Sequence, residues 1–139
     1  MARAASALPD ACQLLTAIEA STVAGVPLAL GGHAGGGDCR YYGSGGAAAN
    51  ALEISVKVEA DAASARANFS RWAAMAPGST NPAVTPVDNV GDQASLTRSG
   101  TTHSGICFRR GPVLVRIGVH PGVSDSALTA AAITVLSRM

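Results

Sequence analysis

The sequence predicts an α+β fold, a mostly antiparallel sheet with helices packed on it. Residues 51–60 alternate apolar and polar side chains, which is typical of a strand with one face on a core and one polar face, and a sheet of that kind is usually antiparallel. Residues 62–76 change to the helical period. The strand–helix alternation of parallel folds and internal repeats are absent from the sequence. We therefore expect one domain over residues 1–139, in the order α-α-β-β-α-β-β-β-α, with residues 1–8 as a disordered stub.

Two short helices are predicted at the start of the chain, over residues 10–15 and 17–24. Thr16 and Glu19 fit a capping box, in which each side chain accepts a hydrogen bond from the backbone N–H of the other residue. Gly25 is a natural helix stop, because glycine adopts the left-handed conformation without steric cost. The two segments are therefore expected to form a kinked helical pair.

The middle of the chain predicts two strands and a longer helix. Residues 39–42 favour a short edge strand between glycine-rich loops, and residues 51–60 form the clearest strand pattern in the sequence. The helix predicted for residues 62–76 has one apolar stripe, and we expect it to end at Pro77-Gly78.

Three further strands and a last helix are predicted after a turn-rich stretch. One strand lies around residues 93–97, and residues 105–110 and 113–120 form a hairpin that turns at Gly111-Pro112. The second hairpin strand alternates, with Leu114, Arg116 and His120 on one face and Val113, Val115, Ile117 and Val119 on the other. Ser124 is expected to cap a helix that runs to the C-terminus.

Composition and charge exclude several classes of function. Apolar residues make up 47% of the chain and charged residues 14%, so the chain can bury a core. The net charge is +1, and the basic residues are scattered, so we expect no nucleic-acid binding. No apolar run approaches the roughly 20 residues of a membrane span. The opening "MARAASALPD" lacks the apolar segment of an intact signal peptide, which leaves a cytoplasmic protein or a leader that is not part of this chain.

The three cysteines bear on the compartment. A disulfide between Cys12 and Cys39 would close a glycine-rich loop and stabilise the fold by roughly 3–4 kcal/mol in the loop-entropy model. Two unrelated buried thiols, or a pairing of Cys39 with Cys107, are the alternatives, because pairing does not follow from sequence alone. Cys107 alternates with Ile106 and therefore lies beside Arg109. We expect it to be a small core residue; the alternative is a reactive thiol whose pKa the neighbouring arginines lower.

Several short motifs follow one another in an order that resembles a known group of proteins: "LPDACQLLTAIEA", "CRYY", "LEISVKV", "VDNVGDQASLT" and "FRRGPVLVRIGV", before an alanine-rich last helix. The chain resembles small extracytoplasmic domains and lipoproteins of unknown function from high-GC bacteria, which are similar in pattern to the extracellular sensor domain of some membrane-bound serine/threonine kinases. In those families the cysteine of the early helix and that of the Cys-x-Tyr segment commonly form a disulfide, so the resemblance implies a Cys12–Cys39 bridge.

The same resemblance implies that Gly91-Asp92 is the Gly-Asp of the later loop in those families. It implies a role outside the cytoplasm and no established chemistry. The chain departs from the family pattern because it has no visible leader or lipobox and because it carries Cys107.

Sequence motifs for catalysis or cofactor binding are absent. The glycine-rich stretches lack the spacing of nucleotide-binding loops, and the sequence has no Gly-x-Ser-x-Gly elbow. His33, His103 and His120 have no metal-site spacing, so we expect no metal and no cofactor, and solvated loop positions for the first two. Asp92, after Gly91, is expected to be a turn residue whose carboxylate accepts from backbone N–H groups.

Tyr41, Tyr42, Arg109 and Arg110 are the candidate recognition residues, because tyrosine and arginine combine apolar area with polar tips. Neighbouring strand residues point to opposite faces, so only one of each pair can lie on a given surface, and ordinary edge positions are the alternative. We expect a non-enzymatic, extracytoplasmic or secreted domain that binds a small ligand or an envelope protein; a cytoplasmic location is the alternative. The second hypothesis is an assembly module that docks on a partner or on itself. The third is a small enzyme with a His/Asp or Cys site assembled in space.

Overall fold

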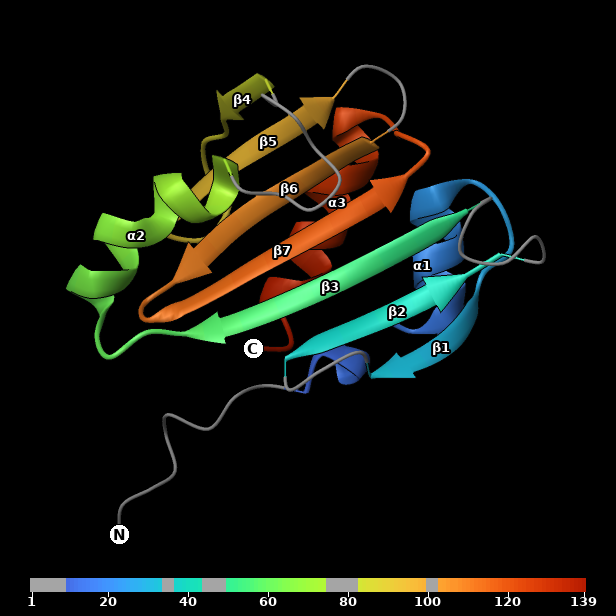
Figure 1. Ribbon diagram of the computed structural model, residues 1–139, viewed down its shortest axis with the longest axis horizontal. Coiled ribbons are helices and arrows are strands. Elements are labelled where there is room, and N and C mark those ends of the chain that lie inside the picture. Colours follow the sequence, from blue (N-terminus) through green and yellow to red (C-terminus); the bar gives the residue numbers. More distant parts are fainter. Residues whose placement is uncertain (1–9, 34–36, 44–49, 75–82, 100–102) are drawn as a thin grey trace, which may run out of the picture.

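The computed structural model is built on one antiparallel sheet, which has seven strands in the part of the chain that it describes (Figure 1). The described residues are 10–33, 37–43, 50–74, 83–99 and 103–139. The strand order is β1-β2-β3-β7-β6-β5-β4, and all neighbours are antiparallel. The predicted α+β class is therefore confirmed. The expected stub and the expected helix end at Pro77-Gly78 lie outside the described residues.

The elements differ from the predicted order in three places. In chain order they are η1 (Ala11–Gln13), α1 (Ala17–Ala24), β1 (Ala29–His33), β2 (Asp38–Tyr42), β3 (Ala51–Val58), α2 (Ala62–Ala74), β4 (Ala83–Pro86), β5 (Gln93–Ser99), β6 (His103–Arg110), β7 (Val113–His120) and α3 (Asp125–Leu136). The first predicted helix is one short 3-10 turn, η1, which Asp10 caps by accepting a hydrogen bond from the backbone N–H of Cys12. The other two differences are the strands β1 and β4, which the sequence analysis does not predict.

Both additional strands lie at the edges of the sheet. β1 contains two adjacent glycines that hide any alternation, and its pairing with β2 is irregular between Leu30 and Gly32. β2 was expected at the edge and is instead the second strand, because β1 pairs with it. β4 is exposed along its whole length and ends in Pro86, a residue that edge strands accept because no neighbour requires its N–H.

The predicted helix caps are present. Thr16 and Glu19 form the capping box: the Thr16 hydroxyl accepts from the Glu19 backbone N–H at 3.1 Å, and the Glu19 carboxylate accepts from the Thr16 backbone N–H at 2.9 Å. Gly25 ends α1 in the left-handed conformation, with φ 75°. Ser124 caps α3 by accepting from the backbone N–H of Ala127.

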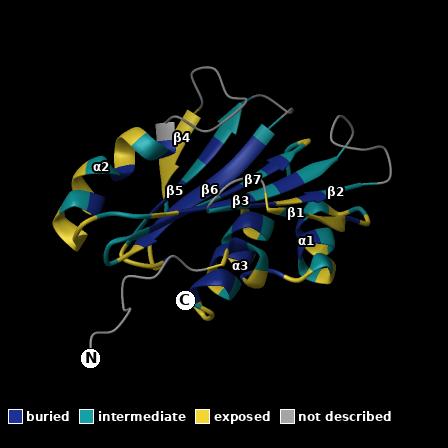
Figure 2. Ribbon diagram, turned by 60° about the horizontal axis from the view of Figure 1, so that its bottom comes forward, coloured by how far each residue is buried: buried dark blue, intermediate teal, exposed yellow. Residues whose placement is uncertain are grey.

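The sheet separates two groups of helices (Figure 2). α1, α3 and η1 cover one face, where the alternating side chains of the central strands form the main core. This core includes Ile54, Ile106 and Ile117, each fully buried. α2 lies on the other face, against β5, β6 and β7. It covers only one end of that face and leaves the remainder for a pocket.

A disulfide joins Cys12 of η1 to Cys39 of β2, with 5.1 Å between the two Cα atoms. The pairing implied by the family resemblance is therefore confirmed, and the alternative pairing of Cys39 with Cys107 is wrong. Tyr41 lies two residues further along β2 on the same buried face, and its hydroxyl donates to the carbonyl oxygen of Leu15 at 2.6 Å. The bridge and this hydrogen bond fasten the N-terminal segment to the sheet.

Gly91 and Asp92 hold the turn of the β6–β7 hairpin. The backbone N–H of Asp92 donates to the carbonyl oxygen of Arg109 at 2.7 Å, and a carboxylate oxygen of Asp92 accepts from the backbone N–H of Gly111 at 2.7 Å. Asp92 therefore accepts from a backbone N–H, as the sequence analysis expects of a turn residue. Gly91 has φ 59°, which glycine adopts most easily.

Candidate functional site

A pocket opens on the sheet face that carries α2. Its volume is about 210 Å³, and β2, β3, β5, β6 and β7 contribute the residues that line it. Because strand residues alternate between faces, most of these side chains lie on the face opposite the main core. The pocket lies next to α2: the guanidinium group of Arg116 lies over the ring of Trp72, 4.5 Å from its centroid.

Two glycines make the floor of the pocket. The antiparallel register places Gly105 of β6 directly opposite Gly118 of β7. The same cross-strand row continues to Glu53 and Arg40 on one side and to Thr97 on the other. Because neither glycine has a side chain, the middle of the row is open between polar residues at both ends. Glycine inside a strand often marks a place where another molecule approaches the backbone.

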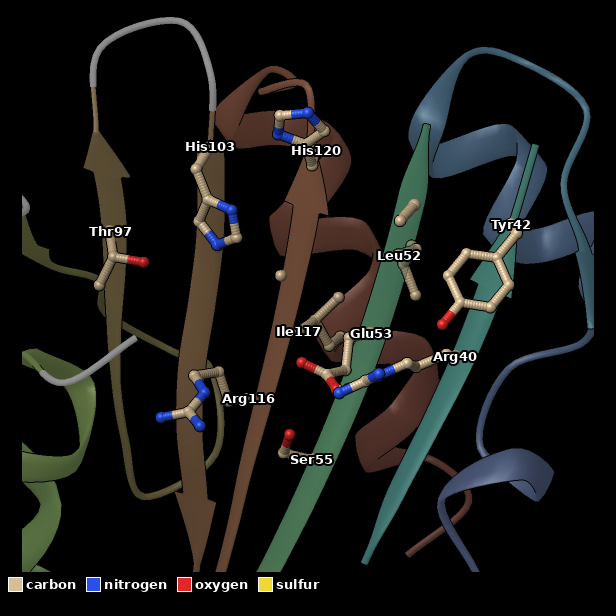
Figure 3. Close-up of a pocket in the computed structure, with 13 residues that line it drawn as sticks. Arg40, Tyr42, Leu52, Glu53, Ser55, Thr97, His103, Arg116, Ile117 and His120 are labelled. Carbon is tan, nitrogen blue, oxygen red and sulfur yellow. The ribbon is translucent and has the colours of Figure 1, made fainter. Parts of the chain in front are cut away.

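Aromatic side chains stand along one flank of this row. Tyr42 pairs with Ala51, and Ala51 pairs with His120. His103 occupies the next position on β6, one residue beyond the last paired residue of the β6–β7 ladder. Figure 3 shows His103 and His120 at the same end of the pocket.

The ring of Tyr42 packs against a glycine of β1, where a larger residue would leave no space for it. A Cβ atom on Gly31 would lie 2.7 Å from two ring carbons of Tyr42, far inside van der Waals contact. The second glycine of β1, Gly32, has φ 101° and lies at the irregularity in the ladder. Gly31, one of the two glycines that hid β1 in the sequence, therefore makes room for a residue of the pocket.

Arg40 and Glu53 form an ion pair at the β2 side of the pocket (Figure 3). The Nε–H of Arg40 donates to a carboxylate oxygen of Glu53 at 2.7 Å. The carboxylate of Glu53 and then the hydroxyl of Tyr42 raise the pKa of Arg40 above its ordinary value. The positive charge of Arg40 therefore balances the negative charge of Glu53 inside the pocket.

Arg116 has a different environment. One of its N–H groups donates to the carbonyl oxygen of Trp72 at 3.1 Å, and the guanidinium group stacks on the Trp72 ring. Among the described residues no carboxylate lies within ion-pair distance of Arg116. Backbone and ring contacts thus orient the guanidinium without neutralising its charge.

His103 is partly buried beside these charges. Burial lowers its pKa below the usual value; the charge of His120 and then that of Arg116 lower it further, whereas Glu53 opposes the shift. Near neutral pH the imidazole of His103 is therefore neutral. Its Nε2 would lie 3.3 Å from a Cβ atom placed on Gly118, so the ring borders the floor of the pocket.

Thr97 closes the opposite end of the row. The residue is 2% exposed, and its hydroxyl oxygen has no hydrogen-bond partner within the ranges that the structure describes. A Cβ atom on Gly105 would lie 3.1 Å from this oxygen, so the hydroxyl is directed over the glycine floor.

The four candidate recognition residues lie in different places. Tyr42 lines the pocket. Tyr41 is fully buried in the opposite face, where it has no surface to offer a ligand. Arg109 is 7% exposed and donates to the side chain of Gln93 and to the carbonyl oxygen of Gly111. The binding role expected for these residues stays a prediction, and the structure brings only Tyr42 to the pocket.

Arg110 points to the other side of the sheet from Arg109, as the strand alternation predicts. Its guanidinium donates to the carbonyl oxygen of Leu136 in α3 at 3.0 Å. Cys107 packs beneath α2 against Phe69 and Leu114, and burial raises its pKa to about 12. Cys107 is therefore the core residue that was expected, and the reactive-thiol alternative is wrong.

His33 lies outside the pocket, on β1. Its Nε2 is 2.7 Å from a carboxylate oxygen of Asp10, and Cys12 lies close to both. The sulfur of Cys12 is bonded to Cys39 and is not a free thiolate ligand, so this group offers a metal ion only two donors. The pair instead links β1 to the segment that precedes η1.

Arg40, Glu53 and Arg116, which line the pocket, were not among the residues predicted for a site. His103 and His120 were considered only for an enzyme site assembled in space. The expected solvated loop position of His103 is wrong, because the residue begins β6 and is partly buried in the pocket. One signal was available. The predicted turn at Gly111-Pro112 sets the hairpin register, and counting back from it places Gly105 opposite Gly118.

The helices of the described ranges include none that is long and apolar enough to cross a membrane. No family model matches the chain, and neither the curated proteins nor the solved structures include a match.

Proposed function

We propose that this chain is a small-ligand-binding domain that acts outside the cytoplasm, and that the sheet-face pocket is its binding site. The observation that carries the proposal is the hollow over Gly105 and Gly118, which polar side chains surround. Binding sites are typically concave and apolar, with a few polar groups that fix the orientation of the ligand. Here the walls include the ring of Tyr42 and the side chain of Ala51, and the polar groups are those of Glu53 and Arg116.

The size of the pocket supports a small ligand. Its volume of about 210 Å³ is below the ~300 Å³ at the lower end of pockets for drug-sized molecules. A compact molecule with one ring fits this space better than a peptide or a nucleotide.

An enzyme site of the His/Asp or Cys type would use Asp92 or Cys107. The environments of both residues favour a binding domain over an enzyme. Asp92 accepts a hydrogen bond from the Gly111 backbone in the hairpin turn, and Cys107 is packed under α2. His103 and His120 lie in the pocket, but its carboxylate, Glu53, pairs with Arg40. The proposal is therefore a domain that holds a ligand without transforming it.

The disulfide supports a location outside the cytoplasm. Structural disulfides persist in oxidising compartments and are rare in the cytosol. The Cys12–Cys39 bridge closes a loop with a sequence separation of 27 residues, and it fastens η1 to the sheet. The family resemblance, which concerns bacterial envelope proteins, supports the same location.

The experiment that tests the proposal is a fragment screen by NMR on ¹⁵N-labelled protein. Small carboxylates, amides and amines are added at millimolar concentration, and the amide signals of Gly105 and Gly118 are followed. Gly118→Val fills the floor of the pocket. Ala83→Val adds the same kind of bulk on the exposed strand β4 and serves as the control.

We expect at least one fragment to shift the two glycine signals, in a way that Gly118→Val abolishes and Ala83→Val leaves unchanged. The proposal is wrong if no fragment shifts these signals. It is also wrong if Gly118→Val keeps its fold and still binds as the unsubstituted protein does.

A further inference from the structure

The charges around the pocket do not cancel. Arg40, Glu53 and Arg116 are the arginine and carboxylate residues that line it in the described part of the chain. Arg40 and Glu53 pair at 2.7 Å and neutralise each other. Arg116 keeps its charge without a carboxylate partner, so the arginine and carboxylate groups of the described lining together carry a net positive charge.

The guanidinium group of Arg116 is held in one orientation and has N–H donors left for a ligand. A guanidinium group has five N–H donors in a fixed plane, and the Trp72 carbonyl takes one of them in the described structure. The stack on the Trp72 ring restricts the orientation of the plane. A carboxylate is the group that such a fork binds with two parallel hydrogen bonds. Because the side chain is already held, less conformational entropy is lost when the partner binds.

Much of the remaining wall is apolar. The ring of Tyr42, the methyl group of Ala51 and the bare backbone of Gly105 and Gly118 form the surface next to the charged groups. A sugar would require many acceptors and donors, and the carboxylate of Glu53 is already engaged by Arg40. A cation would be repelled by Arg116.

We infer that the ligand is a small organic monoanion, a carboxylate on an apolar body, with its charged group at Arg116 and its apolar part over the glycine floor. This inference rests on the proposed function, because it concerns the same pocket. The hydroxyl of Thr97, which is buried and directed over Gly105, supplies a further donor at the edge of the floor.

The test uses three probes of nearly the same shape and different charge: benzoate, benzamide and benzamidinium. Each is titrated into the ¹⁵N-labelled protein at neutral pH, and the amide signals of Gly105 and Gly118 report binding in the pocket. We expect benzoate to bind at least about tenfold more tightly than benzamide, because a hydrogen bond to a charged group contributes more than one to a neutral group. We expect no shift with benzamidinium.

Two variants of Arg116, with a control variant of Arg66, test whether Arg116 binds the charged group of the probe. Arg116→Gln removes the positive charge and keeps an N–H donor for the Trp72 carbonyl, so we expect the affinity for benzoate to fall to that for benzamide. Arg66→Gln makes the same change on the exposed side of α2 and should leave the affinity for benzoate unchanged. Arg116→Lys keeps the charge and loses the planar fork. It should retain a weaker preference for benzoate, and it serves as the second variant if Arg116→Gln does not fold.

The outcomes separate this inference from the proposed function. Equal binding of benzoate and benzamide at the two glycines would overturn the inference while the pocket remains a binding site. A preference for benzoate that survives in folded Arg116→Gln would also overturn it. If none of the three probes, and no fragment of the screen, shifts the glycine signals, the proposed function itself is wrong.

Discussion

The hydroxyl of Tyr41 donates a hydrogen bond of 2.6 Å to the carbonyl oxygen of Leu15, and both residues are buried. Leu15 follows η1, and Tyr41 belongs to β2, which the Cys12–Cys39 bridge also joins to η1. Burial raises the pKa of Tyr41 above its usual value, so the phenol keeps its proton and remains a donor. The disulfide and this buried hydrogen bond thus both attach the N-terminal segment to the sheet.

Tyr41→Phe should lower the free energy of unfolding by about 1–3 kcal/mol, because it leaves the buried carbonyl of Leu15 without this donor. Tyr42→Phe is the matched control. It removes the same hydroxyl from the neighbouring residue, which lines the open pocket and is only half-buried, so we expect a smaller loss. Urea unfolding followed by circular dichroism measures both, and similar losses for the two variants would contradict the expectation.

The Cys12–Cys39 bridge should contribute about 2–4 kcal/mol to stability, because it restricts the unfolded chain. The double variant Cys12→Ser, Cys39→Ser measures this contribution in urea.

Alkylation in denaturant without reductant, followed by intact mass, should modify one thiol, that of Cys107. In the native protein the same thiol should react slowly, because burial raises its pKa to about 12. Three modified thiols in denaturant would show that the bridge does not form.

Gly91 and Gly111 have nearly the same backbone conformation, with φ 59° and 57°, but different surroundings. A Cβ atom on Gly91 would lie 2.5 Å from the carbonyl oxygen of Arg109, whereas one on Gly111 meets nothing within 4 Å. Gly111→Ala should therefore cost only the left-handed conformation, about 1–2 kcal/mol. Gly91→Ala should cost clearly more, because the clash is with backbone that also accepts from Asp92. Equal urea midpoints for the two variants would contradict this reading of the Gly-Asp segment.

The sequence predicts correctly those features that depend on residues close to one another along the chain. The capping box of Thr16 and Glu19 and the cap at Ser124 depend on residues three positions apart, and the structure has both. The alternation of Arg116 and His120 against the core residues of β7 also holds, because it depends on one strand. β1 was missed because its two glycines carry no side-chain pattern, although one of them, Gly31, makes room for Tyr42.

The pocket could not be derived from local pattern because it depends on the pairing of distant strands. Arg40 and Glu53 meet only when β2 and β3 pair, and Glu53 reaches Gly118 only through the β3–β7 ladder. The Gly105–Gly118 pair is the exception, since the hairpin turn determines it. A pair of glycines opposite each other in a predicted hairpin is thus a usable signal for a hollow in a sheet.

The pKa of His103 should report the charge of whatever binds in the pocket. In the free protein, burial lowers this pKa, His120 and Arg116 lower it further, and Glu53 opposes them. A carboxylate bound at Arg116 adds a negative charge to the pocket that His103 borders, so the pKa of His103 should rise in the complex.

Because binding then takes up a proton, the affinity for benzoate should increase as the pH falls through the pKa of His103 in the complex. The increase should level off below the lower pKa of the free protein. A titration of the imidazole signals with and without benzoate measures both values. His33, which pairs with Asp10 outside the pocket, is the internal control and should not respond. His103→Gln should bind benzoate with an affinity that changes less over this pH range, because one of the two imidazoles of the pocket is removed. An unchanged pKa of His103 in the saturated complex would show that the carboxylate does not bind at Arg116 in this pocket.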